Sequence, residues 1–294
     1  MENKSKIIIS CKDYTATNES FDLILNEEFE MLFTSPKPKE EDLSKYYDSD
    51  AYISHTDSTK SLIDKIYQIV KNYTIAKKVE LINSFQSEEK EILDIGCGTG
   101  DFLEVSKSNG WKVVGIEPND KAKNVAVKKV NLAKAEVSRF YKNIEDLIDK
   151  KGNQQFDIIT MWHVLEHVYD LEDYISKLEK LLKPNGRLII AVPNYKSYDA
   201  TYYREFWAAY DVPRHLWHFS QKSITKLFGM KNMKLVKTLP MKFDSYYVSL
   251  LSEKYKTGST NLLRALLIGI RSNQKAKATK EYSSLIYILK KQIN

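Results

Sequence analysis

Residues 91–101 read Glu91-Ile92-Leu93-Asp94-Ile95-Gly96-Cys97-Gly98-Thr99-Gly100-Asp101. The stretch begins with an apolar run typical of a buried strand, and three glycines follow within five residues, in a chain that holds ten. Residues 101–109 then have the periodicity of a short helix. Glycines let the backbone turn tightly and approach a ligand closely, and the start of a helix offers free N–H donors. The stretch therefore predicts a strand, a ligand-binding loop and a helix.

Strand and helix patterns alternate along the rest of the chain. We predict further strands at 112–116, 156–161, 187–192, 233–239 and 284–290. Helical patterns cover 61–85, 120–130, 171–183, 221–228 and 262–270, with Ile69, Tyr73 and Val125 among the expected buried side chains. Strands separated by helices are typical of a parallel sheet covered on both faces, so we predict an α/β fold.

Composition excludes several classes of protein. The chain has 294 residues, 43% of them hydrophobic and 29% charged, which excludes a largely disordered protein. Only two cysteines are present, Cys11 and Cys97, too few for a disulfide scaffold or a zinc site, and a reducing cytoplasm fits best. No stretch approaches the roughly 18 apolar residues of a membrane span. The net charge of +6 comes from 39 Lys and only 6 Arg, scattered along the chain, so nucleic-acid binding is disfavoured.

The glycine spacing argues against a dinucleotide as the ligand. Dinucleotide-binding loops read Gly-x-Gly-x-x-Gly and hold pyrophosphate at the start of the helix. Here the sixth position is Asp101, whose carboxylate would repel pyrophosphate, so an NAD-linked oxidoreductase is disfavoured. Glu117 ends the next strand, 21 residues after Gly96, where an acid can accept both ribose hydroxyls of a nucleoside. A nucleoside with a zwitterionic amino-acid tail, S-adenosylmethionine, fits this pattern.

Four motifs together resemble class I S-adenosylmethionine-dependent methyltransferases, of the bacterial group related to quinone O-methyltransferases. They are residues 91–101, Glu117, residues 156–167 and residues 181–194, and the resemblance covers about 75–240. It implies a Rossmann-like, mostly parallel sheet of seven strands with the last strand reversed and with helices on both faces. An N-terminal extension and an aromatic-rich insertion after the fifth strand would complete the fold.

The resemblance also implies the residues of the cofactor site. The glycine loop would surround the methionyl tail, the acid after the second strand would hold the ribose, and residues after the third strand would lie near adenine. S-adenosylhomocysteine would be the product. The expected cofactor-binding residues are Asp94, Gly96, Cys97, Gly98, Gly100, Glu117, Pro118, Asn143, Ile144, Glu145, Trp162 and His163.

His163, Glu166 and His167 have three interpretations. Their spacing would put all three side chains on one face of a helix. In the first interpretation His163 is a general base beside the transferred methyl group. In the second the three hold a divalent cation, because similar quinone-ring O-methyltransferases carry Glu, Glu and His at the matching positions and use a metal there; His163 would favour zinc-like ions over Mg²⁺. In the third, Glu166 and His167 are structural. A zinc protease with the same spacing is disfavoured by the surrounding pattern.

Residues 195–219 are rich in aromatic side chains, nine in 25. In this fold the segment would follow the carboxyl end of a strand, where ligands bind, and cover the acceptor site. His215 would then be a second candidate base, and Arg214 could hold a carboxylate or phosphate. The alternative is that the aromatic side chains pack a subdomain or a dimer contact and that the backbone satisfies the histidines.

Residues 1–60 are predicted to be an irregular extension, with one weak strand at Phe21–Leu25. The segment resembles a zinc ribbon that has lost its cysteines. The second cysteine pair would fall near Asn26 and Phe29, so we expect apolar packing and no zinc. Residues 61–294 would form the methyltransferase domain, with 195–220 as the insertion over the substrate.

The sequence thus predicts a methyltransferase. The acceptor would be an O or N atom of a small molecule, a glycan or a lipid precursor, and a base would be needed only where the acceptor must lose a proton. A catalytically silent S-adenosylmethionine-binding module is the alternative. Either a monomer or a homodimer is compatible with the sequence.

Overall fold

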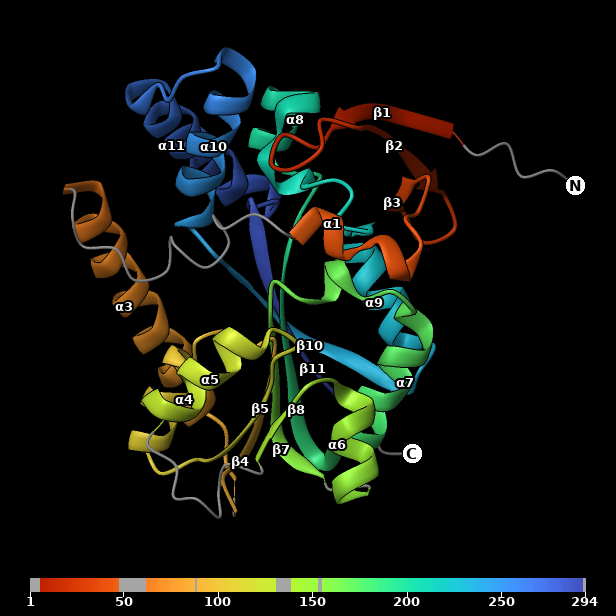
Figure 1. The fold of residues 1–294 in the computed structure, drawn as a ribbon, viewed down its shortest axis with the longest axis vertical. Coiled ribbons are helices and arrows are strands. Elements are labelled where there is room, and N and C mark those ends of the chain that lie inside the picture. The colour runs from red at the N-terminus through yellow and green to blue at the C-terminus, as the bar shows by residue number, and fades with distance from the viewer. Residues whose placement is uncertain (1–5, 48–61, 88, 131–138, 153–154, 293–294) are drawn as a thin grey trace, which may run out of the picture.

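The computed structural model describes residues 6–47, 62–87, 89–130, 139–152 and 155–292. A large twisted sheet with a layer of helices on each side forms the body of the molecule, and a small second sheet lies at one end of it (Figure 1). The order of the large sheet is β10-β11-β8-β7-β4-β5-β6. Its strands are β4 (Glu91–Ile95), β5 (Lys112–Ile116), β6 (Phe140–Tyr141), β7 (Phe156–Trp162), β8 (Leu182–Pro193), β10 (Met233–Pro240) and β11 (Ser284–Lys291).

The pairing within this sheet confirms the predicted α/β fold. Strands β6, β5, β4, β7 and β8 pair in parallel, whereas β11 is antiparallel to both β8 and β10. The sheet is therefore seven-stranded, mostly parallel and reversed at its last strand. Ile92, Leu93 and Ile95 of the central strand β4 are buried because helices cover both faces.

Two groups of helices cover the sheet. On one face lie α3 (Leu62–Asn83), α4 (Asp101–Ser108) and α5 (Asp120–Lys129), and on the other α6 (Ile144–Lys151), α7 (Leu171–Leu181) and α9 (Gln221–Gly229) (Figure 1). Ser220 caps α9, with a capping box to Ser223.

The buried face of α3 differs from the predicted one. Ile69 and Tyr73 are 68% and 51% exposed, whereas Ile75, Val79 and Ile82 are buried. Val125 of α5 is also exposed. An apolar repeat establishes that a helix forms, but which turns are buried depends on where the sheet and the next helix lie. Among the described side chains of α3, those in the core that this helix shares with α4 come from its second half.

The N-terminal region is a small antiparallel sheet, so the prediction that it is irregular is wrong. β1 (Lys6–Lys12), β2 (Ser20–Asn26) and β3 (Met31–Ser35) form a meander, and β9 (Trp217–His218) adds a fourth strand beside β3. Ile7 and Ile8 of β1 are exposed, so this strand has no clear alternation of polar and apolar residues for the sequence to reveal.

A third apolar core joins this small sheet to the aromatic segment. Cys11, Phe21, Leu23 and Leu32 pack with Trp207 and other members of residues 200–212. Burial raises the pKa of Cys11 to about 12, so this residue is a thiol, and apolar packing occurs as predicted. The predicted boundary at residue 60 lies outside the described residues.

Short helices and a helical hairpin complete the fold. Within the aromatic segment lie α8 (Tyr198–Tyr203), η4 (Arg204–Phe206) and η5 (Ala208–Tyr210); η1 (Glu40–Asp42) and α1 (Ser44–Tyr47) follow β3, and η3 (Leu165–His167) follows β7. The hairpin consists of α10 (Asp244–Thr257), which the sequence did not predict, and α11 (Leu262–Thr279). None of the helices in the described ranges is sufficiently long and apolar to span a bilayer.

Trp207 tests the aromatic core. Its indole N–H donates to Asp199 at 2.8 Å, and the hydroxyls of Ser272 and Ser283 donate to the same buried carboxylate. We expect Trp207→Ala to lower the free energy of unfolding by about 3–5 kcal/mol, because it opens a cavity and removes a hydrogen bond to a buried charge. Denaturant unfolding measures this loss. Met230→Ala, at an exposed site, is the control and should cost less than about 0.5 kcal/mol; equal losses would contradict the assignment.

Candidate functional site

The glycine loop lies at the carboxyl end of β4 and is held by the neighbouring strand. The backbone N–H groups of Gly96 and Cys97 both donate to the carbonyl of Ile116, at 2.8 and 3.0 Å. Ile116 is the last residue of β5, so parallel pairing of the two strands places the loop directly beside Glu117. The carboxyl ends of β4 and β5 therefore form the edge of the sheet at which open α/β proteins bind ligands.

The three loop glycines have different roles. All three have positive φ, at +71°, +54° and +81° for Gly96, Gly98 and Gly100. A Cβ atom at Gly96 would lie 2.4 Å from a methyl group of Val164, and one at Gly100 would lie 2.9 Å from the backbone of Ala126. A Cβ atom at Gly98 would meet nothing within 4 Å. Two glycines therefore allow close packing, and the middle one borders open space in which a ligand fits.

Glu117 faces this open space. Its carboxylate accepts the N–H of Gly98 and the N–H of Asn119, both at 2.9 Å. Burial raises the pKa of Glu117, and the two hydrogen bonds oppose that shift. The acid is held in place next to the loop, as required of a group that binds a ribose. Pro118, which follows it, is exposed.

Asp101 is less repulsive toward a phosphate than the sequence suggests. Its carboxylate pairs with Lys71 at 3.0 Å and with Lys129 at 2.7 Å, and it also accepts from the hydroxyl of Thr99. These partners hold the pKa of Asp101 below its usual value although burial opposes them. The electrostatic argument against pyrophosphate is therefore weaker, and the argument from the glycine spacing remains.

Asp94 and Lys78 form a charge pair at the base of the loop. Burial raises the pKa of Asp94 to about 7, whereas the hydroxyl of Thr160, which donates to it at 2.6 Å, and the charge of Lys78 lower it. Burial lowers the pKa of Lys78. The ammonium group of Lys78 also lies 4.2 Å from the centre of the Trp162 ring, a cation–π contact. Trp162 is half-buried, and its indole N–H has no partner among the described residues.

The residues expected near adenine lie at the same edge of the sheet. Strand β6 pairs in parallel with β5, and the N–H of Glu117 donates to the carbonyl of Tyr141. Asn143 caps α6 through Asp146 N–H, and Ile144 is buried. Glu145 pairs with Lys177 at 2.6 Å. These three residues lie where the sequence predicts the adenine-binding residues. However, the side chains of Asn143 and Glu145 bind Asp146 N–H and Lys177, and that of Ile144 packs in the core.

His163, the first predicted base, lies between two carboxylates, which favour its protonated form. The backbone of His163 has φ of +59°, and its backbone N–H donates to the carbonyl of Ala191. Nε2 lies 3.1 Å from Asp244 and Nδ1 lies 3.4 Å from Glu166. Burial alone would lower the pKa of His163, but these two carboxylates raise it to about 10.

The structure gathers a different trio from the predicted metal set. Glu166, His167 and His215 bring one ligand atom each to within 4.8 Å of one another. His163 is not in this trio, because residues 165–167 form a single 3₁₀ turn and not the predicted α-helical face. Glu166 is buried, and neither of its carboxylate oxygens has a hydrogen-bond partner among the described residues. A buried carboxylate next to two imidazoles offers the types of donor that transition metals prefer.

Both histidines donate from Nδ1 to a backbone carbonyl. Nδ1 of His167 lies 3.0 Å from the carbonyl of Arg214, and Nδ1 of His215 lies 2.9 Å from the carbonyl of Ala209. A carbonyl can only accept, so each Nδ1 carries a proton. Burial lowers the pKa of His167 to about 4, so its ring is neutral. Metal-binding histidines commonly have such a backbone partner.

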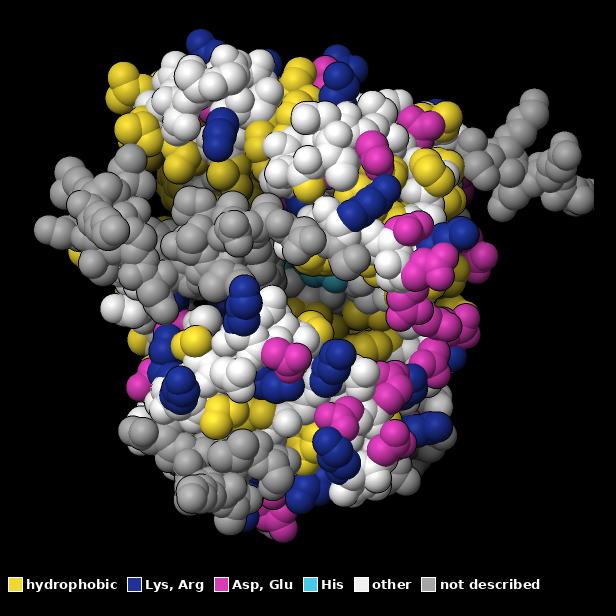
Figure 2. Space-filling model, viewed as in Figure 1, with side chains coloured by type: hydrophobic (Ala, Val, Ile, Leu, Met, Phe, Trp, Pro, Cys, Tyr) yellow, Lys and Arg dark blue, Asp and Glu magenta, His cyan; other side chains and the backbone are white. Residues whose placement is uncertain are grey.

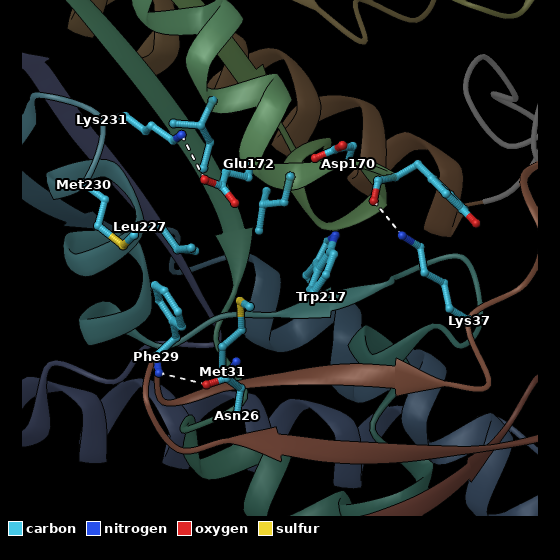
Figure 3. A pocket seen from close by; sticks show the side chains of 13 residues that line it. Asn26, Phe29, Met31, Lys37, Asp170, Glu172, Trp217, Leu227, Met230 and Lys231 are labelled. Carbon is cyan, nitrogen blue, oxygen red and sulfur yellow. Dashed lines mark hydrogen bonds and ion pairs between the residues drawn. The ribbon is translucent and has the colours of Figure 1, made fainter. Parts of the chain in front are cut away.

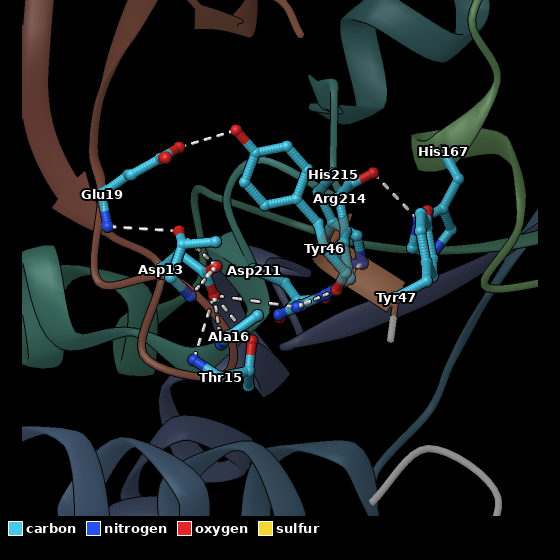
Figure 4. A network of polar contacts seen from close by, with 11 residues as sticks. Asp13, Thr15, Ala16, Glu19, Tyr46, Tyr47, His167, Asp211, Arg214 and His215 are labelled. Carbon is cyan, nitrogen blue, oxygen red and sulfur yellow. Dashed lines mark hydrogen bonds and ion pairs between the residues drawn. The ribbon is translucent and has the colours of Figure 1, made fainter. Parts of the chain in front are cut away.

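Arg214 ties the N-terminal sheet to the aromatic segment (Figure 4). Its guanidinium makes a bidentate ion pair with Asp211, donates to the carbonyl of Tyr46 at 2.9 Å and lies 3.7 Å from Asp13. These contacts occupy the group that the sequence predicts for a substrate carboxylate or phosphate. Tyr47, next to Tyr46, places its hydroxyl 3.0 Å from Nδ1 of His167. The network thus brings the N-terminal region to the edge of the histidine cluster.

A separate cavity of about 350 Å³ lies between the N-terminal sheet, α7 and α9 (Figure 3). None of the predicted cofactor or catalytic residues lines it. Lys37 lies over the ring of Tyr169 at 3.5 Å and near Trp217, and much of the remaining lining is apolar. We do not assign this cavity to the reaction, because it lies away from the glycine loop and Glu117.

Sequence reasoning missed two charged residues of the site, Lys78 and Asp244. Lys78 follows buried Ile75 by three positions and precedes buried Ile82 by four, so a cation on the buried face of a helix was a usable signal. Asp244 gave no signal, because it reaches His163 from a helix 81 residues further along the chain. Such a contact depends on tertiary structure.

The chain is similar in sequence to known methyltransferases. A family model described as "Methyltransferase domain" matches residues 55–238. A ubiquinone biosynthesis O-methyltransferase of Rhodopseudomonas palustris is 35% identical over 114 residues, which is 38% of this chain and 44% of that protein. The protein of the same name from Pelagibacter ubique is 36% identical over 159 residues, 48% of this chain and 64% of that protein. The matches thus span less than two thirds of these relatives.

Solved structures share the fold at low sequence identity. A magnesium protoporphyrin IX methyltransferase from Synechocystis PCC 6803, with bound S-adenosylhomocysteine, has a TM-score of 0.54 at 16% identity, covering 85% of this chain and 99% of that one. A cyclopropane synthase from Mycobacterium tuberculosis has a TM-score of 0.53 at 16% identity, covering 87% and 99%. Likenesses at this identity establish the fold alone.

The charge on His163 predicts a pH dependence. Its folded pKa of about 10 exceeds the ordinary value of 6.5, so its contribution to stability is complete below pH 6.5 and is lost as the pH rises through 10. Asp244→Asn should therefore lower the free energy of unfolding by about 1–3 kcal/mol at pH 6, and the gap should shrink toward pH 10. Urea unfolding at several pH values measures it. Asp120→Asn, at an exposed acid, is the control, and a gap that is constant with pH would refute the ion pair.

Proposed function

We propose that this chain, which belongs to the methyltransferase domain family, binds S-adenosylmethionine and transfers its methyl group to an oxygen of a small, partly apolar acceptor. One observation carries the proposal: Gly98 borders open space at the carboxyl edge of the sheet, and Glu117 is fixed beside it by two backbone hydrogen bonds. The fold and the family support the same conclusion.

The choice of acceptor rests on the relatives. The two relatives described above are named ubiquinone biosynthesis O-methyltransferases, which favours oxygen over nitrogen and an acceptor related to a lipid precursor. A small molecule or a glycan remains the broader class. We propose residues 61–294 as the catalytic domain, with 195–220 and the N-terminal sheet on the acceptor side, because these two regions share a core and Tyr47 reaches His167.

The protein's own part in the reaction is binding, alignment and exclusion of water. A bound sulfonium donor supplies an already activated methyl group for in-line displacement, so alignment accounts for much of the catalysis. The glycine loop would hold the methionyl tail, Glu117 the ribose hydroxyls, and the edge after β6 the adenine. Asp94, Glu166 and Asp244 would place negative charge around the donor, and the buried aromatic segment would limit the access of water.

Removing a proton from a hydroxyl acceptor requires a group with a free lone pair. We assign this role to His215 in preference to His163. Nδ1 of His215 donates to Ala209 and its Nε2 lies 3.8 Å from Asp211, whose carboxylate is already paired with Arg214, whereas both nitrogens of His163 lie within 3.4 Å of carboxylates. His163 keeps its place as a site residue, with its imidazolium between Glu166 and Asp244.

A divalent ion offers His215 a second role. The described donor set fits a zinc-like ion through Glu166, His167 and His215, two imidazoles and a carboxylate. The ion would supply Lewis-acid activation of the acceptor oxygen. His163 would then lie outside the coordination sphere, unlike the predicted set.

A silent cofactor-binding module is the competing function. Purified protein, cell extract and methyl-labelled donor separate the two: transfer of label to any product supports an enzyme, and binding of S-adenosylhomocysteine without transfer supports the module. Titration with NAD tests the oxidoreductase alternative in the same preparation.

Glu117→Gln tests the cofactor site. We expect the Kd for S-adenosylhomocysteine, measured by calorimetry, to rise about tenfold or more, because hydrogen bonds to a charged acceptor contribute about 1.5–3 kcal/mol. Glu104→Gln, at an exposed position on α4, is the matched control and should bind as the wild type does. An unchanged Kd in Glu117→Gln, or tight binding of NAD, would overturn the assignment.

The metal set is tested by metal content and not by activity. After equilibration with Zn²⁺ and desalting, mass spectrometry of the wild type should find about one ion per chain. His215→Ala should lose the ion and His163→Ala should keep it. The reverse pattern would favour the trio predicted from sequence, and an absence of bound metal in the wild type would leave His215 as the base.

A further inference from the structure

The hairpin of α10 and α11 has an exposed apolar surface. Leu262, Leu263, Leu266 and Leu267 are 53%, 76%, 50% and 55% exposed. They recur at one- and four-residue steps at the start of α11, so they lie on one side of it, while Ala265 and Ile268 face the core. We call these four leucines and the cations around them the α11 face. Figure 2 shows hydrophobic side chains gathered over the α10–α11 hairpin, at the upper left.

The exposed charged side chains of the hairpin are all basic. Residues 244–280 contain seven Lys and Arg and only two acids. Asp244 is paired with His163, and Glu253 is buried and lies 3.8 Å from Arg264, so Glu253 offsets that one cation and neither acid reaches the other basic groups of α11. The cations on α11 and just beyond it are exposed: Arg264, Arg271, Lys275, Lys277 and Lys280. Leucines therefore lie next to basic groups with no exposed acid within this segment.

This combination has a physical consequence. Single exposed apolar side chains are ordinary, but contiguous ones mark a surface that another apolar phase covers. A helix with leucines on one side and cations on its exposed rim fits the headgroup region of an anionic bilayer, where apolar burial and charge attraction add. A second copy of the chain fits less well, since a two-fold contact would place these cations against one another.

The position of the hairpin connects it to the site. Asp244, the first residue of α10, contacts His163 at 3.1 Å. Phe243, just before it, packs edge-on against exposed Tyr73 of α3 at 5.7 Å between ring centres, and Phe243 and Tyr247 are themselves exposed. Exposed apolar side chains therefore continue from the start of α10 onto α3, beside the cofactor crevice.

We propose that the α11 face docks the protein on an anionic lipid surface. The hairpin then presents the mouth of the crevice to the bilayer, from which an apolar acceptor is taken. The docking itself stands on the exposed leucines and cations; the uptake of an acceptor rests on the proposed function.

Flotation with lipid vesicles tests the docking. The wild type should float with vesicles that contain phosphatidylglycerol and not with vesicles of phosphatidylcholine alone, and added salt should weaken the binding. Leu263→Glu combined with Leu267→Glu should weaken it about tenfold or more. Arg271→Glu combined with Lys277→Glu should remove the preference for anionic lipid. Met230→Glu is the control, because Met230 is equally exposed but lies at the end of α9.

Two further measurements keep the outcome interpretable. All variants should bind S-adenosylhomocysteine as the wild type does, which establishes that they fold and separates docking from the cofactor site. Light scattering after size exclusion gives the oligomeric state. Failure of the wild type to bind anionic vesicles would overturn the proposal, and so would a dimer that the leucine substitutions dissociate, since a second copy would then cover the face.

Discussion

The parallel pairing of β4 with β5 is the constraint on which the rest of the site depends. Through it the carbonyl of Ile116 accepts the N–H groups of both Gly96 and Cys97, which fixes the turn of the glycine loop. The same register places Glu117 next to Gly98, and pairing of β5 with β6 adds the edge at 143–145. A change of register by one residue would move the acid to the opposite face of the sheet. The geometry of the loop, the position of Glu117 and the open space beside Gly98 therefore all depend on this one strand pairing.

The acceptor side is built in a different way, from segments distant in sequence. The small N-terminal sheet gains its last strand from residues 217–218, and Arg214 joins Asp211 to Tyr46. The backbone of Leu216 donates to the carbonyl of Glu166, so the aromatic segment is tied to the turn after β7. His215 reaches Glu166 and His167 because these contacts hold it there. The geometry of the histidine cluster thus depends on the N-terminal sheet, about 180 residues away.

This difference explains what the sequence could predict. Most strands and helices of the large sheet, the glycine loop and Glu117 follow from local periodicity and from one fixed spacing, whereas the two-residue strand β6 and the helix α6 were not predicted. The small sheet was missed because β1 lacks alternation and β9 has only two residues. His163 was expected to share a helix with Glu166 and His167, but a positive φ at His163 and a 3₁₀ turn place it toward Asp244 instead. The partner Asp244 comes from another helix, which no local pattern reveals, whereas Lys78 left a local signal that was not used.

The charges around the crevice are consistent with a cationic donor. Asp94, Glu117, Glu166 and Asp244 contribute four carboxylates, and Lys78 and His163 contribute two basic groups. When all six groups are ionised, negative charge is in excess. A sulfonium brings one positive charge, and its amino-acid tail is neutral overall, so its binding would reduce this excess. Asp94, whose pKa is about 7 without a ligand, would be held in its charged form by the added cation. A pyrophosphate would instead add negative charge to this excess, so the charges favour the same ligand as the glycine spacing.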